Sequence, residues 1–266
     1  MKKALGRLAI LAGSAYLFAS VWLYRSQRRM LYYPQPLIAV PRAESFTIES
    51  NGVRRQGWII NPGQTQALLY FGGNRESVEQ CEEFFRRNLP RTSVYLIPYR
   101  GFSGNPGSPS EQALFADALG DYDYIAARHA AVDVMGRSLG SGVATYVAVN
   151  RPVPRLVLTT PYDSIQSLAQ EKYPLFPMRL ILEDKFESWR RVAELTAKTM
   201  ILIAAEDKVV PRASTDRLIS HFRTPPQIVV IGKADHSTII STREYARAIR
   251  KFLTRSRRRR AAIIAS

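Results

Sequence analysis

The sequence predicts an α/β fold in which a mostly parallel sheet of eight strands is flanked by helices. From about residue 44 onward, short runs rich in β-branched and aromatic residues alternate with longer amphipathic stretches. The first two runs lie close together, as in an antiparallel edge, whereas the later runs are separated by helical stretches that parallel crossovers require. A chain of 266 residues with 46% hydrophobic content supplies enough material for one large core.

The expected elements alternate regularly, with one long interruption. Strands are expected at residues 45–49, 56–60, 67–71, 93–98, 132–135, 155–160, 200–204 and 227–231, and helices at 76–89, 109–130, 139–150, 213–222 and 241–253. Ser108 is expected to cap the second helix, with Pro109 in its first turn and Glu111 closing a capping box. Residues 162–199 follow the sixth strand and contain only short amphipathic pieces, so we expect a small cap over the strand ends.

A G-x-S-x-G motif lies between the fifth strand and the third helix, and consists of Gly136, Ser138 and Gly140. A serine on such a sharp strand-to-helix turn has a strained backbone, and the flanking glycines let neighbouring backbone pass without a clashing Cβ. Small residues open the helix that follows. Ser138 is therefore the candidate nucleophile.

Chain order selects the candidate base, because in this arrangement the acid and then the histidine follow the serine. His129 precedes Ser138, and His221 lies inside a helical pattern. His236 follows the last strand in a short loop. A neutral imidazole there would accept the serine proton and later deliver it to the leaving group.

The acid that orients the histidine should follow an intervening strand. Asp207 comes directly after the strand at 200–204 and is the first choice, with Glu206 as the fallback. Asp163, after the preceding strand, is a third candidate. Asp235 is a poor geometric partner because it is adjacent to His236.

An oxyanion hole needs two main-chain N–H donors. One is expected from Leu139, the residue after the nucleophile, and the other from Asn74 in the loop after the third strand. Gly73 would permit the close approach of that loop. The alternative is that residues 72–74 form an ordinary turn.

The N-terminal residues 1–29 contain an uncharged apolar segment at 8–24 with basic residues on both sides. Its length of roughly 26 Å as a helix is just enough to cross a thin bilayer, and Trp22 and Tyr24 lie where an interfacial aromatic belt would place them. A cleavable signal peptide is the alternative, but three arginines follow the segment instead of a small-residue cleavage site. We expect a retained single-pass anchor. The balanced basic flanks leave its orientation open.

The net charge of +16 is concentrated at the two ends of the chain. Residues 30–250 carry only about +4, so the sequence argues against a nucleic-acid enzyme, whose basic surface would cross the folded domain. The expected domain therefore covers residues 30–254, followed by a basic tail at 255–266. The Arg257–Arg260 run in this tail is either solvated or in contact with anionic lipid.

The single cysteine, Cys81, excludes an intramolecular disulfide. It lies in the acidic stretch Glu79–Glu83, which would raise the thiol pKa, so we interpret it as structural.

Several ordered motifs in residues 30–254 carry a family resemblance. Besides the G-x-S-x-G turn, Asp207 and His236, they are Tyr32-Tyr33-Pro34, Gly57-Trp58, Tyr99-Arg100-Gly101-Phe102-Ser103-Gly104, Pro109-Ser110-Glu111, Thr160-Pro161-Tyr162-Asp163-Ser164, Tyr173-Pro174, Lys185-Phe186-Glu187-Ser188 and Val210-Pro211. With these residues the chain resembles the α/β-hydrolase superfamily, specifically its membrane-anchored abhydrolase group, which is related to the serine aminopeptidase-like hydrolases.

The resemblance implies hydrolysis of an ester, thioester or amide through an acyl-serine intermediate, without a cofactor or a metal. Relatives commonly have His-Gly-Asn where this chain has Gly72-Gly73-Asn74, which weakens a substrate assignment by analogy. We expect a serine hydrolase acting on a small acyl-ester, thioester or lipid substrate at a membrane. The alternatives are an aminopeptidase-type amide hydrolase, a catalytically inactive binding protein of this fold, or a polyanion binder that uses the basic tail.

Overall fold

A computed structural model describes residues 2–40 and 42–254, so the predicted basic tail lies outside the described residues. It confirms the α/β fold with an eight-stranded sheet in the order β1-β2-β4-β3-β5-β6-β7-β8. The strands β1 and β2 form an antiparallel pair, β2 pairs antiparallel with β4, and all other neighbours are parallel. Their bounds are Glu44–Ser50 (β1), Val53–Ile60 (β2), Gln66–Phe71 (β3), Ser93–Leu96 (β4), Ala131–Arg137 (β5), Arg155–Thr159 (β6), Lys198–Ala204 (β7) and Gln227–Ile231 (β8).

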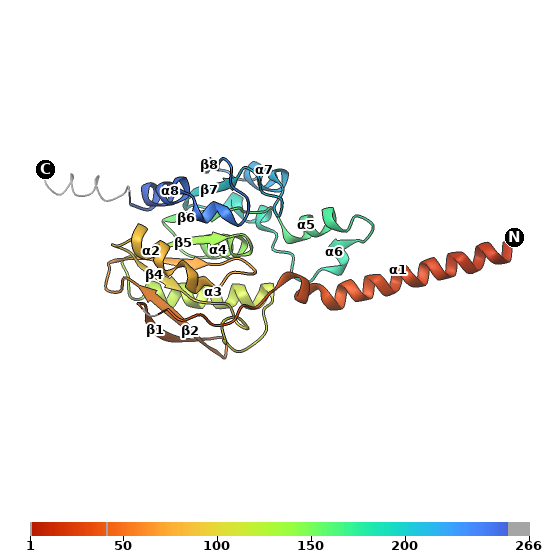
Figure 1. Ribbon diagram of the computed structural model, residues 1–266, viewed down its shortest axis with the longest axis horizontal. Coiled ribbons are helices and arrows are strands. Elements are labelled where there is room, and N and C mark those ends of the chain that lie inside the picture. Colours follow the sequence, from red (N-terminus) through yellow and green to blue (C-terminus); the bar gives the residue numbers. More distant parts are fainter. Residues whose placement is uncertain (1, 41, 255–266) are drawn as a thin grey trace.

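Helices cover both faces of the sheet (Figure 1). Successive side chains of a strand point to opposite faces, so Leu69 of β3 packs in the same cluster as Leu114 of α3, whereas Leu68 packs in the cluster of Phe85 of α2. The first face carries α3, α4 and α7, and the second carries α2 and α8. Their bounds are Glu82–Asn88 (α2, preceded by a 3-10 turn at Val78–Cys81), Glu111–Ala126 (α3), Leu139–Asn150 (α4), Arg212–Ser220 (α7) and Arg243–Thr254 (α8).

The start of α3 differs from the prediction. Ser110, not Ser108, is the N-cap, and its hydroxyl accepts the N–H of Ala113 at 3.2 Å. Glu111 does not close a capping box, because its carboxylate accepts the N–H groups of Lys185 at 2.7 Å and Phe186 at 3.0 Å. A contact distant in the sequence therefore replaces the local one.

Between β6 and β7 the chain leaves the sheet and forms a cap. It comprises α5 (Ile165–Lys172), α6 (Met178–Ile181) and two 3-10 turns at Ser188–Arg190 and Val192–Glu194. The N-terminal helix α1 (Lys2–Leu31) packs against α6 at its C-terminal end and extends away from the domain on that side (Figure 1). By length and composition α1 is able to cross a membrane.

Candidate active site

Ser138 lies at the turn between β5 and α4, with backbone angles of φ 50° and ψ −119°. Such a conformation is strained for a residue with a side chain, and it holds the hydroxyl above the end of the strand. The flanking glycines are sterically required. A Cβ at Gly136 would collide with the carbonyl of Gly140, and a Cβ at Gly140 would collide with the carbonyl of Phe71.

The structure brings Ser138, His236 and Asp207 into one chain of hydrogen bonds. The Ser138 Oγ lies 2.9 Å from His236 Nε2, and His236 Nδ1 lies 2.8 Å from Asp207 Oδ2. The other carboxylate oxygen of Asp207 accepts the N–H groups of Val209 and Val210, both at 2.8 Å. The aspartate follows β7 and the histidine follows β8, so parallel strands bring both loops to the edge where β5 ends. This arrangement can move the serine proton to the imidazole and stabilise the imidazolium that results.

The other acids considered from the sequence lie elsewhere. Glu206 is exposed. Asp163 is buried, accepts hydrogen bonds from Ser214 and binds the Arg217 guanidinium at 2.9 Å. Asp235 accepts the N–H groups at the start of a 3-10 turn.

The two remaining histidines also have other partners. His129 bonds the hydroxyl of Tyr95 and the carbonyl of Gln64. His221 is exposed and bonds the carbonyl of Arg217. Neither contacts Ser138.

The loop after β3 lies beside the serine. A Cβ at Gly73 would be 3.6 Å from Ser138 Cβ, so this loop passes close to Ser138. Leu139 is the first residue of α4, and the N–H of a first helical residue has no carbonyl partner within its helix. At Gly72, a Cβ would lie 2.6 Å from Cγ1 of Val78, so Val78 fills the space that a side chain at this position would need.

A cavity of about 490 Å³ extends outward from Ser138, Leu139 and Asn74. Its outer walls are mostly apolar and come from two segments. The cap contributes side chains such as Leu168 and Met178, and α1 contributes side chains such as Leu23. The N-terminal helix is therefore part of the wall of this site, which the sequence did not predict.

Comparisons with known proteins identify the fold family, although no family model matches the sequence. The chain is 31% identical over 264 residues to the uncharacterized protein Rv2307c of Mycobacterium tuberculosis, covering 93% of this chain and 92% of that protein. It is 31% identical over 223 residues to the lysophosphatidylserine lipase ABHD12 of Macaca fascicularis, covering 71% of this chain and 56% of the lipase. The structure of an esterase of Pyrococcus furiosus matches with a TM-score of 0.69 and 15% identity, over 85% of this chain and 97% of the esterase. The chain belongs to the α/β-hydrolase superfamily.

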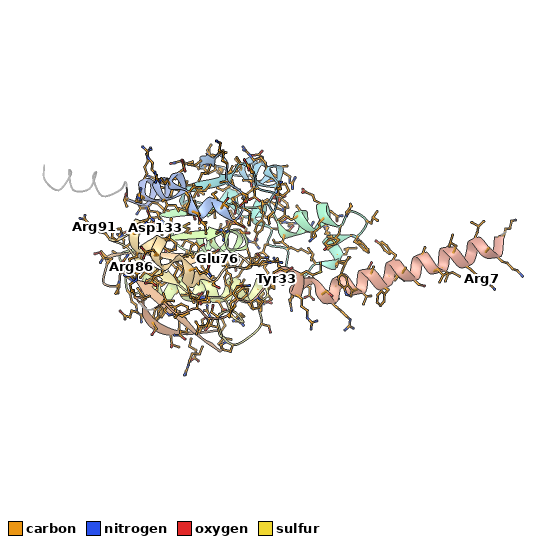
Figure 2. The ribbon with its side chains drawn as sticks, viewed as in Figure 1. Arg7, Tyr33, Glu76, Arg86, Arg91 and Asp133 are labelled. Atoms are coloured by element: carbon orange, nitrogen blue, oxygen red, sulfur yellow. The ribbon has the colours of Figure 1, made fainter. Side chains whose placement is uncertain are left out.

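In this α/β-hydrolase a buried ion pair involves the residue that precedes Ser138. Arg137, the residue before Ser138, places Nη1 2.8 Å from Glu76 Oε2 and donates from Nη2 to the main-chain carbonyl of His236 at 3.0 Å. The same Glu76 oxygen accepts the N–H of Gly73 at 2.8 Å. The pair thus links the turn at Ser138, the loop after β3 and the loop that carries His236. Figure 2 shows Glu76 inside the body of the domain.

The charge state of this pair follows from its contacts. Burial raises the pKa of Glu76, but the Arg137 guanidinium and hydrogen bonds from Tyr70 and Gly73 outweigh it and hold that pKa below its usual range. Burial and the neighbouring Glu76 carboxylate raise the pKa of the Cys81 thiol, whose sulfur lies 3.2 Å from that carboxylate. The predicted rise in the pKa of the Cys81 thiol is confirmed, but its causes are burial and Glu76, not the stretch Glu79–Glu83.

Polar contacts hold α1 of the hydrolase, and the residue that follows it, against the cap. The Arg28 guanidinium lies 3.0 Å from Glu183 and 3.2 Å from Asp184. Tyr32 donates its hydroxyl proton to Asp184 at 3.1 Å, and the side-chain oxygen of Gln27 accepts the N–H of Glu183 at 2.7 Å. Among residues 2–40 and 42–254, no group of three or more His, Cys, Asp or Glu side chains could hold a metal ion.

Proposed function

We propose that the protein is a serine hydrolase that cleaves an ester or thioester of a lipid-type acyl substrate at a membrane. One observation carries the proposal. The hydrogen-bonded chain Ser138–His236–Asp207 lies at the inner end of an apolar cavity whose wall includes α1. The chain of hydrogen bonds supports acyl transfer, and the cavity supports an acyl group as the part of the substrate that is recognised.

Acylation begins when His236 Nε2 takes the proton of the Ser138 hydroxyl while the Oγ attacks the acyl carbon. The carbonyl oxygen becomes an oxyanion, for which we assign the N–H groups of Leu139 and Asn74 as donors. The tetrahedral intermediate then collapses. The bond to the alcohol or thiol breaks, and the imidazolium returns the proton to this leaving group.

Deacylation repeats the sequence with water. His236 removes a proton from a water molecule as its oxygen attacks the acyl-serine carbon, and on collapse the proton returns to the Ser138 oxygen. The free carboxylic acid leaves. Asp207 holds the imidazole in the required tautomer in both halves of the cycle, and the hydrogen bonds from Val209 and Val210 fix its own orientation.

The membrane location is supported by α1. Apolar side chains on this helix are exposed to the surroundings, among them Leu8 at 65%, Leu11 at 66% and Phe18 at 75%. Figure 2 shows Arg7 far out on α1 and Tyr33 at its base, so that this exposed apolar surface stands clear of the domain. A surface of this kind is stable in lipid. A signal peptide cleaved after residue 28 would take with it part of the wall of the cavity and the contacts of Arg28.

A fluorophosphonate probe tests the nucleophile. We expect the probe to label the full-length protein and the Ser138→Ala variant to lose the label. Ser141→Ala is the matched control, because this serine lies one turn away in α4 and its hydroxyl donates to the Ser138 carbonyl. Labelling that persists in Ser138→Ala would refute the assignment.

Turnover of p-nitrophenyl esters of increasing acyl length tests the reaction class. We expect hydrolysis that His236→Ala abolishes, with better kcat/KM for longer acyl chains. Faster cleavage of aminoacyl p-nitroanilides would indicate an aminopeptidase instead. Absence of turnover on every substrate, together with absence of probe labelling, would indicate a binding protein of this fold.

A further inference from the structure

We propose that the tip of the cap, residues 173–180, is immersed in the lipid leaflet beside α1. The outer end of the cavity, at Leu23 and Met178, would then lie at the membrane boundary. The inference rests on the membrane-crossing role proposed for α1, and it adds the depth at which the domain sits and a second segment that enters the bilayer.

The first argument is how far the cap reaches along α1. The Tyr16 ring stacks on Phe176 with centroids 5.1 Å apart, and its hydroxyl donates to the carbonyl of Leu175 at 3.0 Å. Two turns later, Leu23 is buried in the same cluster as Met178. Tyr16 lies in the middle of the apolar segment 8–24, about 12 Å along the helix axis from its end at Tyr24.

The second argument excludes a shallower placement. If the bilayer ended before Tyr16, only residues 8–15 of the apolar segment would remain, about 12 Å of helix against a hydrocarbon core of about 30 Å. At the level of Tyr16 the other faces of α1 expose Leu17 at 66% and Phe18 at 75%. Whatever surrounds these side chains also surrounds the part of the cap that touches Tyr16.

The surface of the tip matches a lipid environment. Leu175 and Leu180 are both 80% exposed, more than any other large apolar residue described. Pro174 and Pro177 flank Leu175 and Phe176. Arg179 is the one charged residue in this segment, and its long side chain can reach back to the headgroups.

The main chain of the tip is also suited to lipid, where an unpaired peptide group is costly. Gln170 donates from its side-chain amide to the carbonyl of Phe176 at 3.1 Å, and its oxygen accepts the N–H of Met178 at 3.1 Å. Tyr16 satisfies the carbonyl of Leu175, and the two prolines have no N–H to satisfy. These bonds satisfy several main-chain groups of the tip without water.

Depth-dependent quenching tests the placement with the full-length protein in phosphatidylcholine vesicles. Single cysteines carrying an environment-sensitive fluorophore are placed at Leu175→Cys, at Phe18→Cys on α1 and at Glu49→Cys in β1. The background is Cys81→Ser, in which a hydroxyl keeps the bond to Glu76. The quencher is a nitroxide partway along the acyl chain of a fraction of the lipid.

The outcomes separate the two claims. We expect the labels at positions 175 and 18 to be quenched alike and the label at position 49 to be unaffected. If position 18 is quenched and position 175 behaves like position 49, the cap tip lies outside the bilayer and this inference is wrong, although α1 is an anchor. If position 18 is not quenched either, α1 does not enter the bilayer, and the anchoring part of the proposed function fails together with this inference.

The kinetics of the double variant Leu175→Asn/Leu180→Asn provide a second test. We expect about tenfold slower hydrolysis of a long-chain p-nitrophenyl ester embedded in vesicles, and unchanged hydrolysis of a short, water-soluble ester. Ile228→Asn is the control, because Ile228 is an exposed apolar residue on the edge strand β8. Equal rates for the double variant and the control on the embedded ester would contradict the proposal.

Discussion

The two ends of the cavity are held together by different kinds of interaction. At the inner end, charged and polar groups are buried and hydrogen-bonded to one another, as in the pairs His236–Asp207 and Arg137–Glu76. At the outer end, α1 meets the cap through apolar packing, and the Arg28–Glu183 pair beside it is about half exposed. Proton transfer needs fixed distances, whereas an acyl chain needs little more than exclusion of water. We therefore expect substitutions at the inner end to affect the rate or the stability, and those at the outer end to affect substrate preference.

The largest effect is expected from Asp207→Asn at the inner end. The amide would favour the wrong imidazole tautomer, so kcat should fall by about 10⁴-fold with little change in stability. Steady-state kinetics on a short p-nitrophenyl ester would measure the loss.

Two other acids are matched controls for this variant. Glu206→Gln, at an exposed position, should leave the rate unchanged. Asp163→Asn should weaken the contacts with Ser214 and Arg217 and lower the melting temperature, without a loss of rate per folded molecule. A larger loss of rate in either control than in Asp207→Asn would transfer the role to that residue.

The next largest effect is expected from Glu76→Gln, which leaves the Arg137 charge buried without a counterion. Removing one partner of a buried pair costs about 3–5 kcal/mol, so the free energy of unfolding in urea should fall by about this amount. The double variant Glu76→Gln/Arg137→Met should recover part of the stability but should lose rate, because removing Arg137 also removes its bond to the His236 carbonyl. A single variant as stable as the wild type would show that the pair contributes nothing to folding.

Acid should remove the stability that Glu76 confers. A carboxyl whose pKa is lowered by folding adds stability above its unfolded pKa, and this contribution is lost as the pH falls through the folded value. The gap in melting temperature between wild type and Glu76→Gln should therefore be widest near neutral pH and shrink below about pH 4. Burial raises the pKa of Asp121 to about 6, which acts in the opposite direction, but it does so in both proteins and does not change the gap. A gap that persists unchanged into acid would contradict an ionised Glu76.

The sequence was sufficient to select side chains whose positions depend on chain order and strand ends. Ser138, Asp207 and His236 could be chosen because parallel strands bring their carboxyl ends to one edge, and the structure places these three side chains within hydrogen-bonding distance. Arg137 was missed because the G-x-S-x-G pattern leaves its position free and its partner Glu76 is 61 residues away.

Contacts between segments that are distant in the sequence were also missed. Glu111 was assigned to a local capping box, but it binds main-chain groups 74 and 75 residues further on. The hydrogen bond from Tyr16 to Leu175 spans 159 residues. No periodic pattern in the sequence indicates such a contact, so the position of α1 against the cap could not be predicted.

The smallest effect is expected at the outer end, from Leu23→Ala. Leu23 lies on α1, is buried against the cap and lines the cavity. Shortening its side chain removes apolar contact with a bound acyl chain. We expect KM for a long-chain ester to rise about tenfold, since a few methylene groups of lost contact are worth this much, and the kinetics of a short ester to stay unchanged. Phe18→Ala is the matched control, because Phe18 lies five residues away on α1 but is 75% exposed. Equal loss with both esters would mean that Leu23 stabilises the catalytic end as well, and the two ends of the cavity would not be separable as described.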